Sequence, residues 1–552
     1  MKSHIYTRIQ QNQVNVHKSE PLDIFFLLYL YHYPLSVSAE NEGLLRKKLN
    51  PVQRGTKEGC MEGTRLDILA RIFEWVEDTN QPNVLWLSGS PGAGKSAIAS
   101  TVVSQLLAKN SKDQHVLSSA FWFKRGDASL GDPASLWCTI VFGLACLDSA
   151  IQQNVIDILA QQDLETAGVE DHFKYLVESS LSKCPPSQLV VIVLDALDEC
   201  GSSASRRQLL RTLQRWTTLP KNCKLLITSR AESDIKRCFT TGTLHIELKT
   251  GAHVNKKTSA DVFLFLSGEF SRIAQDYNSL HPKWPGVLII NELTSRAAGL
   301  FIWAKTVIRF LEEDVPEERL ALIMDGKFGT GDIDKLYMTI LNNAFENARV
   351  GTAKEILGTI ALGQVPLQEI DIQYLLGETL GTIEFVLQKT QSVLVKDRNH
   401  GIELTHKSFA EFLFDPIRSG KFYLNPQILN QRLALSSLQI MNSGLQFNIC
   451  KLEISHLPND KVADLNKRIE RSISSHLAYA CQFWAEHLNG APQEHPESGV
   501  IKGVQDLLYI HLLHWLEVLS VIRAVPIALH ALKVVYEWVK VSLKPGTYWN
   551  EN

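Results

Sequence analysis

The stretch VLWLSGSPGAGKSAIASTVVSQLL, at residues 84–107, decides the fold class of this chain. A short apolar run typical of a buried strand leads into a glycine-rich turn, and apolar residues four apart then predict a helix over residues 97–107. The turn fits the pattern GxxxxGK(S/T), in which glycines let backbone N–H groups surround phosphates and the helix N-terminus adds further donors. Its residues are Gly89, Ser90, Pro91, Gly92, Ala93, Gly94, Lys95 and Ser96.

We expect this turn to bind the phosphates of ATP or GTP. Lys95 would neutralise the β- and γ-phosphates, and Ser96 would bind Mg²⁺. The alternative interpretation is a glycine-rich turn between a strand and a helix that holds no ligand. The full motif, with a strand before it and a helix after it, favours the phosphate-binding loop.

An acidic segment follows the most apolar strand of the sequence. Six apolar residues, 189–194, predict a central strand of a parallel sheet, and Asp195, Asp198 and Glu199 come after it. Ligands gather at the carboxyl ends of such strands, so we expect Asp195 to hold Mg²⁺ directly or through water. Asp198 or Glu199 would orient or deprotonate the attacking water. The alternative is a solvated acidic loop.

A further strand, residues 224–228, ends beside Arg230. An arginine at this strand end would sense or stabilise phosphate charge during catalysis. The alternative for Arg230 is a structural salt bridge.

Strand and helix patterns alternate up to about residue 248. This alternation predicts βαβ units and an α/β domain with a mainly parallel sheet. The expected strands are residues 84–87, 120–123, 189–194, 225–228 and 244–248, and the expected first helix is 64–77.

Helix patterns dominate beyond residue 250. They cover 261–272 and 290–311, with Gly299 inside the second, and residues 335–414 then predict three helices and a hairpin of strands 392–396 and 402–405. Three helices followed by a hairpin are the outline of a winged helix. The chain after 420 reads as helical, with a polar break at 489–499. The predicted domains are a poorly defined N-terminal segment (1–58), a nucleotide-binding α/β domain (59–249), a small helical domain (250–328), a winged helix (329–418) and a C-terminal helical domain (419–552).

Composition narrows the function classes. The 552 residues carry a net charge of -3, which disfavours a basic nucleic-acid surface or a polybasic membrane patch. Nine scattered cysteines without a CxxC pair argue against disulfides or zinc and for a reducing compartment. The apolar run 24–35 is too short to span a bilayer and fits a buried helix or a signal-peptide core, while 507–525 suits an amphipathic bundle helix. We expect a cytoplasmic protein with no membrane span and no nucleic-acid partner.

The motifs together resemble a NACHT domain, and more narrowly the fungal NACHT proteins of the nephrocystin-like N-terminal domain type. Three segments carry the resemblance most specifically, and three further segments support it. They are GSPGAGKSAIA (89–99), DALDEC (195–200) and ITSR (227–230), then GCMEGTR (59–65), GLFIWA (299–304) and LTHKSFAEFL (404–413).

The resemblance to this family, part of the STAND signalling NTPases, implies a nucleotide switch. It implies that His406 on the winged helix touches the β-phosphate of ADP, and that Thr64 and Arg65 lie near the base. It further implies slow ATP hydrolysis that resets the switch, self-association in the triphosphate state, an unknown protein effector, and a role such as fungal innate-immunity or incompatibility signalling. The repeats that family members often carry are not visible here.

Two other functions stay open. One is an interaction scaffold with vestigial hydrolysis. The other is a DNA-linked ATPase with a winged helix, but its expected recognition helix at 370–379 carries Glu378 and no lysine or arginine. A small-molecule P-loop kinase would need an arginine-rich lid, which the sequence does not show.

Overall fold

The computed structural model describes residues 39–542, apart from 53–56, 111–115, 126, 128, 165–166, 202–205, 278, 326–331, 346–349, 398–399, 454–456 and 493–497. The apolar run at 24–35 therefore lies outside the described residues, as does most of the predicted N-terminal segment. The chain forms two compact units. One comprises residues 1–90 and 94–248, and the other comprises residues 91–93 and 249–552.

The first unit is built on a five-stranded sheet with the order β2-β3-β4-β1-β5. All neighbouring strands are parallel, so the predicted α/β class is confirmed. Strands β3 and β4 are almost wholly buried, as expected for strands covered on both faces. The strands are β1 Val84–Gly89, β2 Val116–Trp122, β3 Leu189–Asp195, β4 Cys223–Ser229 and β5 Thr243–Leu248.

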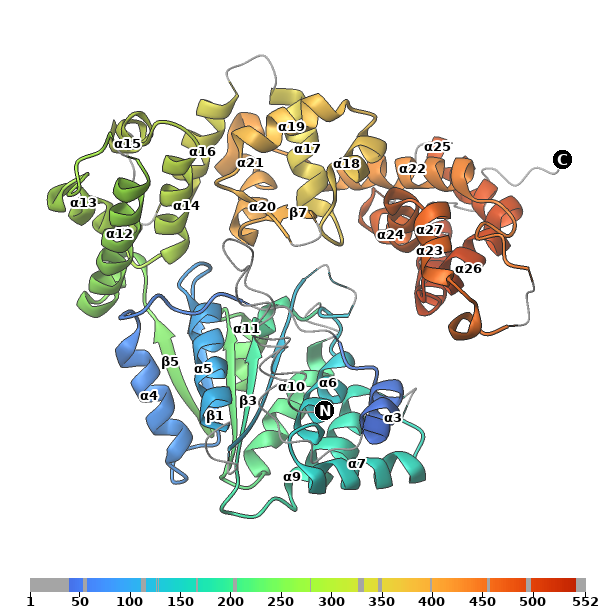
Figure 1. The fold of residues 1–552 in the computed structure, drawn as a ribbon, viewed down its shortest axis with the longest axis horizontal. Helices are drawn as coiled ribbons and strands as arrows, with labels where there is room; N and C mark the ends of the chain where they lie inside the picture. The colour runs from blue at the N-terminus through green and yellow to red at the C-terminus, as the bar shows by residue number, and fades with distance from the viewer. Residues whose placement is uncertain are drawn as a thin grey trace, which may run out of the picture. The chain divides into compact units, whose positions relative to one another are not determined.

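Helices cover this sheet, and α4 (Leu66–Glu77) and α5 (Lys95–Asn110) lie beside β5 and β1 in Figure 1. Under the helices that follow β2, the rings of Trp137, Phe173 and Trp216 form a buried aromatic cluster. The helical elements of the unit are α3 Ala39–Leu49, α4 Leu66–Glu77, α5 Lys95–Asn110, α6 Ser135–Ala145, α7 Ser149–Gln161, α8 Val169–His172, η2 Phe173–Glu178, α9 Ser179–Leu181, η3 Leu197–Glu199, α10 Arg206–Arg215, η4 Trp216–Thr218 and α11 Ser233–Cys238.

The second unit is helical apart from one hairpin, β6 Leu394–Lys396 with β7 Ile402–Leu404, which pair antiparallel. Its elements up to the winged helix are η5 Gly251–His253, α12 Lys256–Asp276, α13 Val287–Ala297, α14 Phe301–Glu312, α15 Pro316–Asp325, α16 Ile333–Ala344, α17 Val350–Leu362, α18 Glu369–Leu376 and α19 Leu380–Lys389. After the hairpin come α20 Lys407–Leu413, α21 Pro416–Ser419, η6 Gly420–Phe422, α22 Pro426–Gly444, η7 Asn459–Lys461, α23 Leu465–Ser472, α24 Ser475–Gly490, α25 Ser498–Asp506, η8 Leu507–His511, α26 Leu512–Val521 and α27 Pro526–Ser542.

The single helical segment expected over 290–311 is wrong, because the chain breaks there into α13 and α14. Ala298 and Gly299 take positive φ angles of 47° and 81°, which no helix can continue. A Cβ on Gly299 would lie 2.8 Å from Cγ2 of Val254, so only glycine fits against that neighbour. The apolar periodicity runs through both helices and concealed the break.

Helices α17, α18 and α19 and the β6–β7 hairpin follow the order of a winged helix. The expected recognition helix at 370–379 is wrong, because α18 ends at Leu376 and the helix before the hairpin is α19. Gly377 ends α18 in the left-handed conformation, and Thr379 caps α19 by accepting from the backbone N–H of Thr382. Since α19 carries Glu384 and Lys389, this helix is not basic either.

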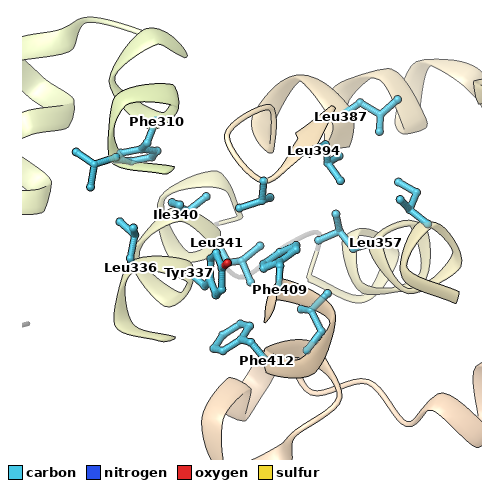
Figure 2. Close-up of a cluster of buried hydrophobic side chains, with 14 of the residues drawn as sticks. Phe310, Leu336, Tyr337, Ile340, Leu341, Leu357, Leu387, Leu394, Phe409 and Phe412 are labelled. Carbon is cyan, nitrogen blue, oxygen red and sulfur yellow. The ribbon is translucent and has the colours of Figure 1, made fainter. Parts of the chain in front are cut away.

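A buried apolar cluster joins α14 and α16 to the winged helix and α20. Figure 2 shows Tyr337 of α16 next to Phe409 and Phe412 of α20, and Leu357 of α17 and Leu387 of α19 belong to the same cluster. The rings of Tyr337 and Phe409 meet edge to face, with centroids 4.9 Å apart. These elements therefore share one core, and the finer domain limits inside the second unit stay a prediction.

No helix among the described residues is both long enough and apolar enough to cross a membrane. The expected helical pattern at 507–525 corresponds to η8 and α26, and the chain turns before α27. All nine cysteines are free thiols. Within the described ranges, no group of three or more His, Cys, Asp or Glu side chains could hold a metal ion.

Candidate nucleotide and metal site

The glycine-rich turn lies between β1 and α5, as predicted. Gly92 and Gly94 have φ angles of 76° and 93°, a conformation that favours glycine and turns backbone N–H groups inward. The ammonium of Lys95 donates to the carbonyl oxygens of Gly89 at 2.7 Å and Ser90 at 3.0 Å. Lys95 thus lies across the mouth of the turn, where it would meet phosphate oxygens.

The tip of the turn, residues 91–93, belongs to the second unit. The backbone N–H of Ile302 donates to the carbonyl of Gly92 at 3.2 Å. A Cβ on Gly92 would lie only 1.9 Å from Cγ2 of Ile302. Gly92 is therefore required by its neighbour as well as by its own φ angle.

Asp195 ends β3 and is completely buried. Its Oδ1 accepts from the Thr228 hydroxyl at 2.5 Å, and its Oδ2 forms an ion pair with Lys57 Nζ at 2.8 Å. Burial alone would raise the pKa of Asp195, but Lys57 and the hydroxyls of Thr228 and Ser96 outweigh it and hold that pKa below its ordinary value. Asp195 is thus an ionised carboxylate at neutral pH.

The two residues predicted to bind metal, Ser96 and Asp195, lie close enough for the Ser96 hydroxyl to help lower the pKa of Asp195. A hydroxyl and a carboxylate supply the hard oxygen atoms that Mg²⁺ prefers, so this pair fits the ion. The strand order brings them to the same edge of the sheet, because only β4 separates β3, which ends at Asp195, from β1, whose glycine-rich turn leads to Ser96 at the start of α5. Their metal binding stays a prediction.

Of the three predicted catalytic residues, Asp198 and Arg230 form an ion pair, and Glu199 makes an exposed hydrogen bond. Asp198 is buried, and it accepts from the backbone N–H of Arg230 at 3.0 Å and pairs with the Arg230 Nε at 3.3 Å. This pair matches the structural alternative for Arg230. Glu199 accepts from the backbone N–H of Arg125 at 3.4 Å, and the Arg125 guanidinium donates to the Asp198 carbonyl.

Sequence reasoning missed Lys57 and Arg125. Lys57 lies 138 residues before its partner Asp195, in a segment without a recognisable period, so the sequence holds no signal for it. Arg125 follows β2, and a search of every strand end for charged residues would have found it. Thr228 belongs to the ITSR segment at residues 227–230, but its contact with Asp195 follows only from the register of β3 and β4.

Thr64 and Arg65 lie just before α4. The Thr64 hydroxyl donates to the Met61 carbonyl at 2.7 Å, and Arg65 is buried with a φ angle of 59°. These contacts give both residues a structural role at the start of the helix. Their proximity to a nucleotide base stays a prediction.

His406 caps α20 in the second unit. Its Nδ1 accepts from the backbone N–H of Ser408 at 3.2 Å and lies 2.7 Å from the Ser408 hydroxyl. Because Nδ1 is an acceptor, the proton of the neutral ring sits on Nε2. His406 can therefore donate one hydrogen bond from Nε2, and its contact with a phosphate stays a prediction.

Residues 64–230 match the family described as "Nephrocystin 3, N-terminal". The matched region contains β1, the glycine-rich turn, Asp195 and Arg230. The family resemblance drawn from the sequence is thereby confirmed for this part of the chain.

Over an alignment of 509 residues, the chain is 23% identical to the vegetative incompatibility protein HET-E-1 of Podospora anserina. The match covers 86% of this chain and 36% of that protein, so the chain spans about a third of the length of its curated relative. The chain is therefore distantly related to HET-E-1 over most of its own length.

Likenesses to solved structures are weak in comparison. The STAND protein with a tetratricopeptide repeat sensor from Pyrococcus horikoshii has a TM-score of 0.39 and 12% identity, covering 88% of this chain and 65% of that one. A Walker-type ATPase of Pyrococcus abyssi has a TM-score of 0.33 and 14% identity, covering 65% of this chain and 98% of that one.

Proposed function

We propose that the chain binds ATP or ADP, with GTP as an alternative, together with Mg²⁺, and that it uses the nucleotide as a switch. The observation that carries this proposal is that the buried carboxylate of Asp195 ends β3 two strands away from β1, whose glycine-rich turn holds Lys95 and leads to Ser96. A hydroxyl, a buried carboxylate and a lysine at the end of a parallel sheet are the groups that a metal-bound polyphosphate needs.

Each residue of the site would have a distinct task. The backbone N–H groups of 89–96 would hold the phosphates, and Lys95 would neutralise their charge. Mg²⁺ held by Ser96 and Asp195 would supply further charge neutralisation across the phosphates. Glu199 would orient the attacking water, and Asp198 would hold Arg230 near the phosphate charge. Hydrolysis would be slow and would reset the switch.

Substitution of Lys95 tests this proposal directly. We expect Lys95→Ala in the full chain to weaken ADP binding about ten-fold or more, because a charge-assisted contact to phosphate is lost. Isothermal titration calorimetry with purified protein measures the affinity. The matched control is Lys109→Ala, which removes a lysine from the far end of the same helix, where it pairs with Glu77. Equal affinities of Lys95→Ala and the control would refute nucleotide binding at this turn.

The finer proposal is a switch set by His406. With ADP bound, the Nε2 proton of His406 would donate to the β-phosphate and hold a closed state. Inverting a 1:99 population requires about 5.5 kcal/mol. Charge-assisted hydrogen bonds contribute roughly 1.5–3 kcal/mol each, so a few of them suffice. ATP would release the clamp and permit self-association.

A signalling role with an unidentified protein effector follows from the relative. Because the curated relative is named a vegetative incompatibility protein, we propose that this chain acts in a related fungal response. The DNA-linked alternative has no support from charge, since α19 carries one acidic and one basic residue. Hydrolysis no faster than that of Lys95→Ala would favour the scaffold alternative instead.

A further inference from the structure

Lys57 is the one described residue whose ammonium forms an ion pair with the carboxylate of Asp195. Nζ lies 2.8 Å from Oδ2, while the Lys57 side chain is 38% exposed and Asp195 is completely buried. The same ammonium lies over the Trp122 ring, 5.5 Å from its centroid. One oxygen of the predicted metal ligand is therefore held by a cation that belongs to the chain itself.

The segment that carries Lys57 is attached to α5, the helix that follows the phosphate-binding turn. The Ser100 hydroxyl donates to the Lys57 carbonyl at 2.5 Å, and the backbone N–H of Cys60 donates to the Thr101 hydroxyl at 2.8 Å. A Cβ on Gly59 would lie 3.0 Å from that same hydroxyl, so the segment lies close against the helix. Lys57 thus reaches Asp195 from a backbone fixed at two points.

The charges around Lys57 decide what it can do. Asp195, Asp198 and Glu199 all attract its ammonium. Asp198 also pairs with Arg230, so Asp195 is the carboxylate that Lys57 neutralises directly. A divalent cation on Ser96 and Asp195 would place two positive charges against this ammonium. Because these charges repel each other, close binding of the ion to Asp195 would weaken the ion pair of Lys57, and the reverse.

We propose that Lys57 is a built-in cation that competes with Mg²⁺ for Asp195, so that the chain retains a nucleoside diphosphate with little need for metal. Lys57 leaves the carboxylate when a metal-bound nucleotide is held, and the metal affinity is lowered by the cost of that exchange. This inference rests on the proposed nucleotide binding and adds a specificity determinant to the same site.

Metal binding to the ADP complex of the full chain tests the inference. Mn²⁺ is used as the probe in place of Mg²⁺, because electron paramagnetic resonance distinguishes bound Mn²⁺ from free Mn²⁺. We expect Lys57→Met to raise the Mn²⁺ affinity about ten-fold, since the competing charge is gone. Lys57→Arg keeps the charge and should leave the affinity at or below that of the unaltered chain. The matched control, Lys124→Met, removes an exposed lysine two residues beyond Trp122 and should change the affinity less than about two-fold.

Two results would overturn the inference. One is an unchanged or lower Mn²⁺ affinity in Lys57→Met, and the other is a higher affinity in Lys57→Arg. Lys57→Arg retains a positively charged partner for the buried Asp195. Its Mn²⁺ affinity can therefore still be measured if Lys57→Met fails to fold. ADP binding is measured in parallel without metal. If the unaltered chain binds no ADP, the proposed function fails, whereas ADP binding without the expected metal effect refutes the role of Lys57 alone.

Discussion

Glu313 is a buried acid at the end of α14, in the second unit. Its side chain is 3% exposed, and Oε1 accepts from the backbone N–H of Ser392 at 2.6 Å. Arg319 lies 3.9 Å away, too far for a close ion pair. Burial is the largest influence and raises the pKa of Glu313 above its ordinary value, against the smaller opposing effects of Ser392 and Arg319.

This raised pKa predicts that stability depends on pH in a defined direction. The folded chain binds the Glu313 proton more tightly than the unfolded chain, so stability falls as pH rises from the ordinary glutamate pKa through the folded one. We expect Glu313→Gln to stabilise the protein at pH 8 and to have less effect at pH 4.5. Urea midpoints at both pH values measure this difference, with the exposed Glu317→Gln as control. A Glu313→Gln variant that is less stable at pH 8 would show that the ionised carboxylate stabilises the fold.

At the scale of elements, the break between α13 and α14 depends on one glycine. Gly299 has a φ angle of 81°, and an added Cβ would approach Cγ2 of Val254 and of Thr258 within 3.0 Å. Gly381 lies inside α19 with no heavy atom within 4 Å of an added Cβ. The two glycines therefore form a matched pair with opposite constraints.

We expect Gly299→Ala to destabilise the second unit by about 1–3 kcal/mol, because it combines backbone strain with a steric clash. Gly381→Ala should instead stabilise α19 by up to about 1 kcal/mol, since alanine loses less conformational entropy in a helix. Chemical denaturation followed by circular dichroism measures both changes. Equal effects from the two substitutions would mean that the break does not need glycine.

The elements differ in how far the sequence predicts them. The five strands and the phosphate-binding turn were predictable, because a buried parallel strand is a continuous apolar run and the loop motif is local. The break at Gly299 was not predictable from the sequence. The clash that requires glycine there involves Val254, which lies 45 residues earlier in the chain. The pairing of Ser96 with Asp195 was expected from motifs, whereas the ion pair of Lys57 depends on tertiary structure alone.

At the scale of the whole molecule, the proposed clamp predicts a change of assembly. Because His406 also caps α20, His406→Ala would lose both the cap and the phosphate contact. His406→Asp keeps a capping oxygen but repels phosphate, so it isolates the clamp. We expect both variants with ADP to shift from monomer to oligomer, as measured by light scattering after gel filtration. The exposed His253→Ala serves as control. If His406→Asp stays monomeric with unchanged ADP content, the clamp does not exist.

The cysteines offer a practical consequence at this same scale. Burial raises to about 12 the pKa of the thiols of Cys138, Cys200, Cys223, Cys238 and Cys481. The thiolate is the reactive form, so these positions resist alkylation while their surroundings remain closed. Four of the five report on the first unit and Cys481 reports on the second. Alkylation followed by peptide mass spectrometry can thus time the opening of each unit separately, without an introduced label.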